Sequence, residues 1–374
     1  MNNYSDHIAI IGGGIAGLAL GIILKNNNIN CVIFEKSKSI SEYGAGISIS
    51  PNGMKVLECM NLKSEFCKVS EQPKNTVFFS NNKKITDVLS EVRTTSRKNL
   101  YKILLKKYLS LDGEIFFDHR LEHLDIQNKN ITFSNTKSFN VCHVAACDGI
   151  KSICQEMISQ SNVKPQFSGY SVWRAIFPHK QNEINFYLGS NFHIVTYPID
   201  RKRISFIAAI KSKNEHIESW KEKGTLSELL SEIEFDILKK YPLIEHSSDI
   251  YKWGIYTRPE LKNLSYQNMT FFGDAAHPIV PFIGQGASLA LEDVFIFGSL
   301  LSKYKNDFKA TQKDYESLRL KRIRSIHKKS LNQAKLNHLS NPLTVFARNI
   351  LMKYTSVILK RTNSIWSYDV KKII

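Results

Sequence analysis

The feature that most constrains the fold of this chain is a glycine-rich turn close to its first residue. The apolar segment His7–Ile11 predicts a strand, and the apolar residues after the turn, spaced three and four apart, predict a helix. The turn between them, Gly12-Gly13-Gly14-Ile15-Ala16-Gly17, fits the pattern G-x-G-x-x-G. In a dinucleotide-binding turn the first glycine permits the tight bend, the second lets the backbone approach a pyrophosphate, and the third allows close packing of helix on strand. The helix start then offers free N–H groups and a positive dipole end to the phosphates.

An acidic residue completes this pattern. Asn30–Phe34 predicts a second strand, and Glu35 follows it, 21 residues after Gly14. A carboxylate at this distance accepts hydrogen bonds from the ribose hydroxyls and disfavours a 2′-phosphate, so FAD or NAD fits better than NADP. The pattern does not separate FAD from NAD. The residues predicted to bind the dinucleotide here are Gly12, Gly14, Ala16, Gly17, Glu35 and Lys36.

Further along the chain the pattern of apolar residues changes. Helical spacing over Arg97–Leu111 is followed by short strand-like segments and a buried strand at Val141–Ala146. From Gly169 the expected elements are antiparallel strands with glycine- and aspartate-bearing turns, then a helix at Thr225–Lys240. The expected antiparallel strands are Tyr170–Phe177, Ile184–Leu188, Phe192–Ile199 and Ile204–Ile210. A last strand at Met269–Phe272 leads into a glycine-bearing loop and a helix from about Ala287 to Tyr304.

The residues of that last strand and loop carry a family resemblance. The segment Phe271-Phe272-Gly273-Asp274-Ala275-Ala276-His277-Pro278, then Pro281, then Gly284-Gln285-Gly286-Ala287, resembles the second FAD motif of the class A flavoprotein monooxygenases. These proteins share the para-hydroxybenzoate hydroxylase fold. The resemblance implies that Asp274 meets the ribityl chain and that the loop bearing Pro281 and Gly284 faces the flavin ring. It also places the helix start at Gly286 and Ala287 there, where a helix N-terminus stabilises negative charge on the reduced flavin.

Other segments are similar to the same family. Cys147–Ser152 resembles its Asp-Gly motif, which implies that Asp148 contacts FAD, but Gln155 stands where the family usually has arginine. That departure leaves NADH and NADPH open as the donor. The segment Gly44-Ala45-Gly46-Ile47 is similar to the loop beside the adenosine and flavin. Arg97 resembles the arginine at a helix start that touches the FAD phosphates, with a surface charge as the alternative.

The closest resemblance is to the salicylate and hydroxybenzoate hydroxylase subgroup, through Tyr170–Ala175, Tyr256–Pro259 and Ser364–Asp369, and it runs from His7 to about Asp369. It implies bound FAD, reduction by NADH or NADPH, and addition of O2 at flavin C4a to give a hydroperoxide. An electron-rich aromatic compound, a phenolic acid or an N-heterocycle, would then take the distal oxygen. The predicted fold class is α/β: a Rossmann-like FAD-binding domain with an inserted antiparallel-sheet substrate domain and a helical C-terminal tail. The expected limits are 1–72, 97–165 and 258–335 for the FAD domain, 73–96 and 166–257 for the substrate domain, and 336–374 for the tail.

The protein's own task in such a reaction is to take a proton from a phenol, and a group with a pKa near 7 suits it. The candidates are His193 and Tyr197, which point the same way in a strand, with Pro281 as a catalytic element of the flavin loop. His193 could instead be an ordinary strand residue, and His277 is expected to be structural. Trp173 and Arg174 are either core and surface residues, or a substrate wall and a carboxylate anchor, and packing with FAD contact is favoured.

Charge and cysteine content bound the remaining possibilities. The formal net charge of +17 could attract anions, but the lysines are spread along the chain and no nucleic-acid motif accompanies them, so nucleic acid is not an expected partner. The six cysteines form no CxxC pair, which predicts reduced thiols in a cytoplasmic protein and no metal site. No apolar run approaches the roughly 18 residues of a membrane span, and no signal peptide is expected before the first strand.

The C-terminal stretch Pro342–Trp366 combines an apolar stripe with basic residues. Such a stripe more often packs onto its own domain, while contact with an anionic membrane is the alternative. Three functions therefore stay open: hydroxylation of a soluble aromatic compound, which is favoured, hydroxylation of a membrane-borne quinone precursor, and a FAD-bound module without turnover. Monomer and homodimer are both compatible with the sequence.

Overall fold

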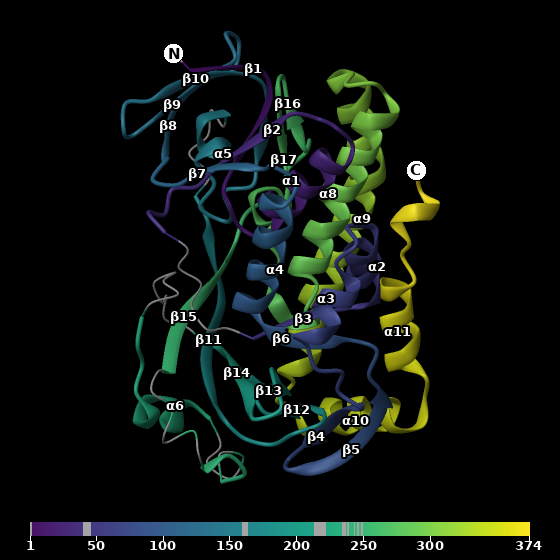
Figure 1. Cartoon of the computed structure of the whole chain (residues 1–374). Helices are drawn as coiled ribbons and strands as arrows, with labels where there is room; N and C mark the ends of the chain where they lie inside the picture. Colours follow the sequence, from purple (N-terminus) through teal and green to yellow (C-terminus); the bar gives the residue numbers. More distant parts are fainter. Residues whose placement is uncertain are drawn as a thin grey trace.

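The computed structural model describes residues 2–39, 46–158, 164–212, 222–233, 237, 239–242, 244, 247 and 250–374. Within them, two large sheets lie one above the other in Figure 1, and helices pack beside both. Among the described residues, none of the helices is long and apolar enough to cross a membrane. All six cysteines are free thiols, as predicted.

The upper sheet in Figure 1 holds the predicted dinucleotide-binding strands. Its order is β16-β17-β10-β1-β2-β7, with β8 and β9 attached beside β10. The strands β10, β1, β2 and β7 pair in parallel, and all four residues of β2 are buried, as expected for parallel strands covered on both faces. The bounds are β1 Asn2–Ile11, β2 Cys31–Phe34, β7 Glu114–Phe116, β8 Leu121–Asp125, β9 Asn130–Phe133, β10 Ser138–Ala146, β16 Ser265–Tyr266 and β17 Met269–Phe271.

Three helices pack together against this sheet: α1 (Ile15–Asn26), α4 (Arg97–Leu109) and α8 (Gly286–Lys303). Helix α1 is buried almost all round because α4 and α8 both pack on it. Around them lie a two-stranded sheet and shorter helices. Their bounds are β3 Gly46–Ile49, β6 Arg93–Ser96, α2 Pro51–Cys59, α3 Lys63–Lys68, α5 Ile153–Ile158, η2 Gly273–Ala275 and η3 Pro281–Ile283.

The lower sheet has seven strands in the order β15-β11-β14-β13-β12-β4-β5. Neighbours are antiparallel except β12 and β4, which pair in parallel, and the β4–β5 hairpin is an element that the sequence pattern did not predict. The bounds are β4 Asn75–Ser80, β5 Lys83–Leu89, β11 Gln166–Pro178, β12 Ile184–Leu188, β13 Phe192–Pro198, β14 Arg203–Lys211 and β15 Ile250–Thr257. Alternation gives this sheet two different faces: the outer face carries an apolar cluster around Trp173, and the inner face turns toward the loop that precedes α8.

The helix predicted at Thr225–Lys240 is shorter than expected. Thr225 and Glu228 form a capping box at its start, but α6 covers only Leu226–Glu232. Ile233 has extended backbone, with φ −132° and ψ 158°, and its side chain is buried in the outer apolar cluster. Packing against the sheet therefore ends the helix before its sequence pattern does.

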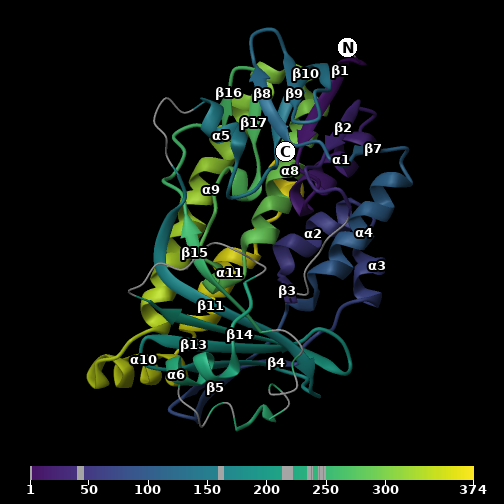
Figure 2. The same cartoon turned by 90° about the vertical axis from the view of Figure 1, so that its left-hand side faces the viewer.

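The C-terminal part is helical, as predicted. Helix α9 (Phe308–Asn337) runs beside both sheets, and α10 (Pro342–Tyr354) and α11 (Val357–Trp366) follow at the periphery, with a short η4 (Val370–Lys372) at the end (Figures 1 and 2). The expectation that the apolar stripe of this stretch packs onto its own domain is wrong for α10. The only residue of that helix that is fully buried is Arg348.

Candidate active site

The glycine-rich turn between β1 and α1 admits no side chain at its first and last glycine. Gly12 has φ +106°, and a Cβ there would lie 2.4 Å from the carbonyl oxygen of Cys147. A Cβ on Gly17 would lie 1.9 Å from the carbonyl oxygen of Gly12. The turn is therefore drawn tightly against the end of β10, which holds the start of α1 in a fixed place.

Two helix N-termini lack side-chain caps in the described structure and face open space. Gly14 is the N-cap of α1, and no protein atom lies within 4 Å of the position its Cβ would take. The same is true of Gly286, which begins α8. Uncapped N–H groups with room in front of them are suited to an anion such as a pyrophosphate or a reduced flavin.

Glu35 lies at the end of β2, beside the same turn. Its carboxylate accepts hydrogen bonds from the backbone N–H groups of Gly13, at 2.7 Å, and Ser37, at 2.8 Å. A carboxylate has acceptor capacity beyond two bonds, so both oxygens keep lone pairs for ribose hydroxyls. Lys36 is exposed next to it, and Ala16 is half-buried on α1 close to Gly273 of the second motif.

Three charged residues of the other motifs lie around this space. Asp148 accepts a hydrogen bond from the backbone of Cys154 at 3.1 Å, while its second oxygen is buried without a partner among the described residues. Such an oxygen calls for a partner such as a ligand hydroxyl. Burial raises the pKa of Asp148. Burial also raises the pKa of Asp274, although solvent reaches this side chain, and the positive charges of His277 and Arg97 oppose the rise. Arg97 thus lies within electrostatic reach of Asp274, at the start of α4.

The loop between η2 and α8, here called the flavin loop (276–286), exposes Pro281 and Gly284 and buries Phe282. Gly284 ends η3 in the left-handed conformation at φ +60°. The loop is tied down on α9, where the Ser330 hydroxyl donates to the carbonyl of Val280 at 2.5 Å. Ala287 follows, half-buried, in the first turn of α8.

A buried ion cluster fixes the base of the flavin loop. Asp293 of α8 bonds His277 at 2.5 Å and Arg319 of α9 at 2.8 Å, and it also accepts the backbone N–H of Gly273 at 3.1 Å. Burial alone would raise the pKa of Asp293, but His277 and Arg319 outweigh it and hold that pKa below its usual range. Arg319 also bonds Glu292 at 2.8 Å. This position of His277 agrees with its expected structural role.

The inner face of the lower sheet supplies the other side of the site. His193 and Tyr197 both lie on β13, and both are buried there. Residues of the flavin loop pack on this face, because Phe282 and Val280 share an apolar cluster with Val172 and Ala209. The His193 ring stands edge-on to the ring of Phe282, with centroids 5.2 Å apart. His193 is therefore brought against the loop bearing Pro281.

Tyr197 lies next to a second cofactor segment. A Cβ on Gly46 would lie 2.6 Å from the Tyr197 hydroxyl and 2.5 Å from the Cβ of Ser205. Strand β3, with Gly46 and the half-buried Ile47, thus passes directly over the inner face. Burial raises the pKa of Tyr197, while Arg174 and Ser205 oppose the rise. Gly44 and Ala45, which belong to the same predicted loop, lie outside the described residues.

A residue that the sequence pattern missed is His338. It follows α9 directly and bonds His193, with 2.7 Å between His193 Nδ1 and His338 Nε2. Both side chains are buried, and burial lowers the pKa of His338 to about 4 and that of His193 well below its usual range. Since the two residues are 145 positions apart, no local signal could have paired them.

The two readings of Trp173 and Arg174 are separated by strand alternation. Trp173 points to the outer face, where it is fully buried and donates to Glu232 at 2.9 Å, so it is core and not a substrate wall. Arg174 points to the inner face, where its guanidinium lies 5.0 Å from the centre of the Trp253 ring. It is not a surface residue, and it lies within electrostatic reach of Tyr197 and Arg97.

Gln155, the departure from the family pattern, has a structural place. Its amide donates to the carbonyl of Ala275 at 2.6 Å, and its oxygen accepts from Arg258 at 2.9 Å. Arg258 in turn donates to the carbonyl of Ile150 at 2.6 Å. Gln155 and Arg258 thus join the Asp-Gly segment to the second FAD motif.

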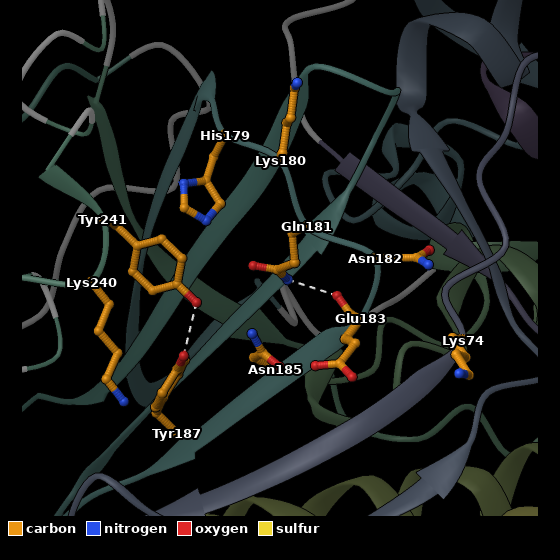
Figure 3. Close-up of a pocket in the computed structure, with 10 residues that line it drawn as sticks. All are labelled: Lys74, His179, Lys180, Gln181, Asn182, Glu183, Asn185, Tyr187, Lys240 and Tyr241. Atoms are coloured by element: carbon orange, nitrogen blue, oxygen red, sulfur yellow. Dashed lines mark hydrogen bonds between the residues drawn. The ribbon is translucent and has the colours of Figure 1, made fainter.

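A surface pocket of about 390 Å³ lies elsewhere (Figure 3). Figure 3 shows the hydroxyls of Tyr187 and Tyr241 pointing toward each other, 2.9 Å apart, among lysines and amides. Both tyrosines belong to the outer apolar cluster, so this pocket opens on the face of the sheet opposite to His193. It does not adjoin the predicted cofactor residues.

Comparison with known proteins identifies the family. The family model described as FAD binding domain matches residues 6–330. The chain belongs to this family. The 3-amino-4-hydroxybenzoate 2-monooxygenase PtmB3 of Streptomyces platensis is 27% identical over 365 residues, covering 91% of this chain and 90% of that protein. Salicylate hydroxylase of Pseudomonas putida is 24% identical over 407 residues, covering 97% and 92%. This FAD-dependent monooxygenase is thus an aromatic hydroxylase by family, and FAD is its cofactor.

Solved structures show the same fold. Klebsiella pneumoniae HpxO complexed with FAD and uric acid superposes with a TM-score of 0.84 at 19% identity, covering 98% of this chain and 96% of that one. A salicylate hydroxylase substrate complex gives 0.81 at 20% identity, covering 99% and 97%. The predicted fold class, an α/β FAD-dependent hydroxylase fold with a helical C-terminal region, is confirmed.

Proposed function

We propose that this FAD-dependent monooxygenase inserts one oxygen atom of O2 into a small electron-rich aromatic compound, a phenolic acid or an N-heterocycle, with NADH or NADPH as electron donor. The observation that carries the proposal is the inner face of the lower sheet, where buried His193 lies against Phe282 of the flavin loop and buried Tyr197 lies beside Gly46. The relatives' names support the substrate class, since aminohydroxybenzoate and salicylate are both electron-rich aromatic acids.

The residues present fit FAD on structural grounds. The open space before Gly14 and Gly286 and the unpartnered buried oxygen of Asp148 match a bound dinucleotide. Gly12, Gly14, Ala16, Gly17, Glu35, Lys36 and Arg97 would hold its adenosine and phosphate part, and Gly46, Ile47, Asp148, Asp274, Pro281, Gly284, Gly286 and Ala287 its ribityl and ring part. When bound, the flavin supplies the activation of O2, and the protein's part is to bind, orient and exclude water.

We assign proton removal to His193. Burial holds its pKa below the value near 7 that suits a general base, so the bond to His338 has to stabilise its protonated form. Because burial lowers the pKa of both imidazoles, His193 and His338 are neutral at pH 7. With His193 Nδ1–H donating to His338 Nε2, the Nε2 atom of His193 keeps a lone pair that accepts the proton of the substrate hydroxyl. The proton at Nδ1 then moves toward His338, which makes His338 the positioning and relay partner of the base.

Arg174 is the proposed anchor for an anionic substrate. It is the cation that strand β11 turns to the inner face, near Tyr197. Arginine binds a carboxylate through two parallel hydrogen bonds, which orients a planar aromatic acid as well as holding it. A phenolic acid is therefore the substrate type that this face suits best.

The test is a screen of the purified flavoprotein against aromatic acids, phenols and pyridines, with NADH and NADPH oxidation, hydroxylated product and peroxide measured together. We expect one ligand group to accelerate oxidation and to give hydroxylated product. With that ligand, His193→Ala should lower product formation by roughly 100- to 10,000-fold while flavin reduction continues and peroxide rises. The matched control is His123→Ala, an exposed histidine on β8. A flavoprotein that no soluble aromatic stimulates would overturn the proposed substrate class.

A further inference from the structure

Helix α10 carries its large apolar side chains on the outside of the molecule. Five of them are exposed, and two more continue the surface at the start of α11. Their exposed fractions are Leu343 79%, Phe346 67%, Ile350 41%, Leu351 54%, Tyr354 68%, Val357 43% and Leu359 46%. We call these seven side chains the C-terminal apolar face.

The five residues on α10 form one continuous stripe. Their positions recur at intervals of three and four, which places them on one side of the helix. In Figure 2, α10 lies at the lower left margin of the molecule, and it packs on β5 of the lower sheet. In a helix that only covers its own domain, this stripe would point inward. The stripe is therefore available to something outside the described chain.

The orientation of α10 is held by a buried arginine. Arg348 donates to the Ser80 hydroxyl at the end of β4 at 3.1 Å, and to the carbonyl of Leu336 on α9 at 3.1 Å. A buried guanidinium is tolerated only when it is hydrogen-bonded, so these bonds hold the side of α10 that carries Arg348 toward the protein. The outward stripe thus follows from specific contacts with two other elements.

The charge of the same stretch is of one sign. Residues 342–366 contain four basic residues and no acidic residue. Lys353 and Lys360 are exposed next to the apolar face, and the chain as a whole carries a formal net charge of +17. An apolar stripe flanked by lysines is complementary to a surface with an anionic outer layer and an apolar layer beneath it.

We propose that α10 and the start of α11 dock on the surface of a lipid bilayer that contains anionic lipid. The C-terminal apolar face enters the boundary between headgroups and acyl chains, and Lys353 and Lys360 contact the headgroups. A second copy of this chain fits less well, because a symmetric contact would set the same basic residues against each other without an acid from this stretch to pair them. The proposal does not depend on the substrate.

The proposed docking surface begins near the candidate active site along the chain: His338, the partner of His193, stands four residues before the first residue of α10.

The test is co-sedimentation of the full-length flavoprotein with vesicles of phosphatidylcholine alone and of phosphatidylcholine with phosphatidylglycerol. We expect binding to the anionic vesicles that weakens as salt is raised. Lys353→Gln should lower the partition coefficient about fivefold, the value of one basic residue at an anionic surface. Equal binding to both vesicle types, or binding to neither, would overturn the proposal.

Two tyrosine variants distinguish binding through the C-terminal apolar face from nonspecific binding of the protein to vesicles. Tyr354→Ser removes an exposed aromatic from the C-terminal apolar face and should lower partitioning about tenfold. Tyr266→Ser removes a tyrosine that is 44% exposed on β16, at the opposite end of the molecule (Figures 1 and 2), and should leave partitioning unchanged. Light scattering of both variants completes the test: a wild-type dimer that Tyr354→Ser converts to a monomer would assign the face to subunit contact and refute membrane docking.

Discussion

The cofactor side of the site is formed mainly by backbone groups, and the substrate side mainly by side chains. On the proposed cofactor side the features are those of the backbone: glycines leave room, helix starts offer N–H groups, and an ion cluster around Arg319 holds the loop. On the proposed substrate side the features are side chains of one sheet face, with a buried bond between two histidines. A glycine turn is recognisable in a sequence, while the chemistry of a sheet face depends on which side chains the fold brings together.

Among side chains, Arg319 of the ion cluster is the one whose loss we expect to lower stability most. Arg319→Met leaves Asp293 and Glu292 buried without that cation, and we expect it to cost about 3–5 kcal/mol of unfolding free energy and to release FAD. Urea unfolding followed by circular dichroism measures the change.

The control for this variant is Arg324→Met on the same helix. Arg324 is half-exposed, and its Nε lies 3.6 Å from Oε2 of Glu260. Its loss should therefore lower the unfolding free energy by no more than about 0.5 kcal/mol. Equal effects of the two variants would mean that the cluster does not support the cofactor side.

The pair His193 and His338 should make the unfolding free energy depend on pH. The folded state keeps the pKa of His338 near 4, and the unfolded chain restores the ordinary value near 6.5. Between these values the unfolded chain binds a proton that the folded chain does not, so stability falls as the pH falls. The expected slope is up to about 1.4 kcal/mol per pH unit for each such histidine.

His338→Phe should therefore reduce the slope of the unfolding free energy against pH by up to that amount on the acid side, because one histidine with a lowered pKa is gone. His193, and His143 with its pKa lowered by burial to about 3, would still contribute. Unfolding free energies at pH 5 and pH 7 measure the slope, with His123→Phe as the exposed control. An unchanged slope would show that His338 titrates normally in the folded protein.

The smallest expected effect concerns a single methyl group on the cofactor side. Apart from its chain neighbours, no described residue has an atom within 4 Å of the methyl in Gly14→Ala, so folding should be unaffected, but the methyl enters the space assigned to the pyrophosphate. FAD binding should weaken at least tenfold, or about 1.4 kcal/mol, in a titration of the apoprotein. Gly17→Ala, whose Cβ would collide with Gly12, should instead prevent correct folding. Tight FAD binding by Gly14→Ala would place the dinucleotide elsewhere.

Much of the fold could be predicted because it follows from local patterns. The predicted strand Ile184–Leu188 is β12 as observed, and the predicted helix from Arg97 is α4. The β4–β5 hairpin and its parallel pairing with β12 were missed, since that pairing joins segments more than a hundred residues apart. The helix from Thr225 was predicted too long, because burial of Ile233 overrides its helical pattern.

The sequence by itself determined that a dinucleotide binds at the glycine turn, and that His193 and Tyr197 share one side of their strand. Both follow from short-range rules: a glycine turn needs only its neighbours, and strand alternation has a period of two. The choice of FAD over NAD came from the family resemblance of the second motif. Tertiary structure alone decided that His193 meets His338, that Arg174 faces inward while Trp173 faces outward, and that α10 turns its apolar side to the surroundings. Each of these three outcomes depends on packing between elements far apart in the sequence, and no local pattern of residues encodes the free energy of that packing.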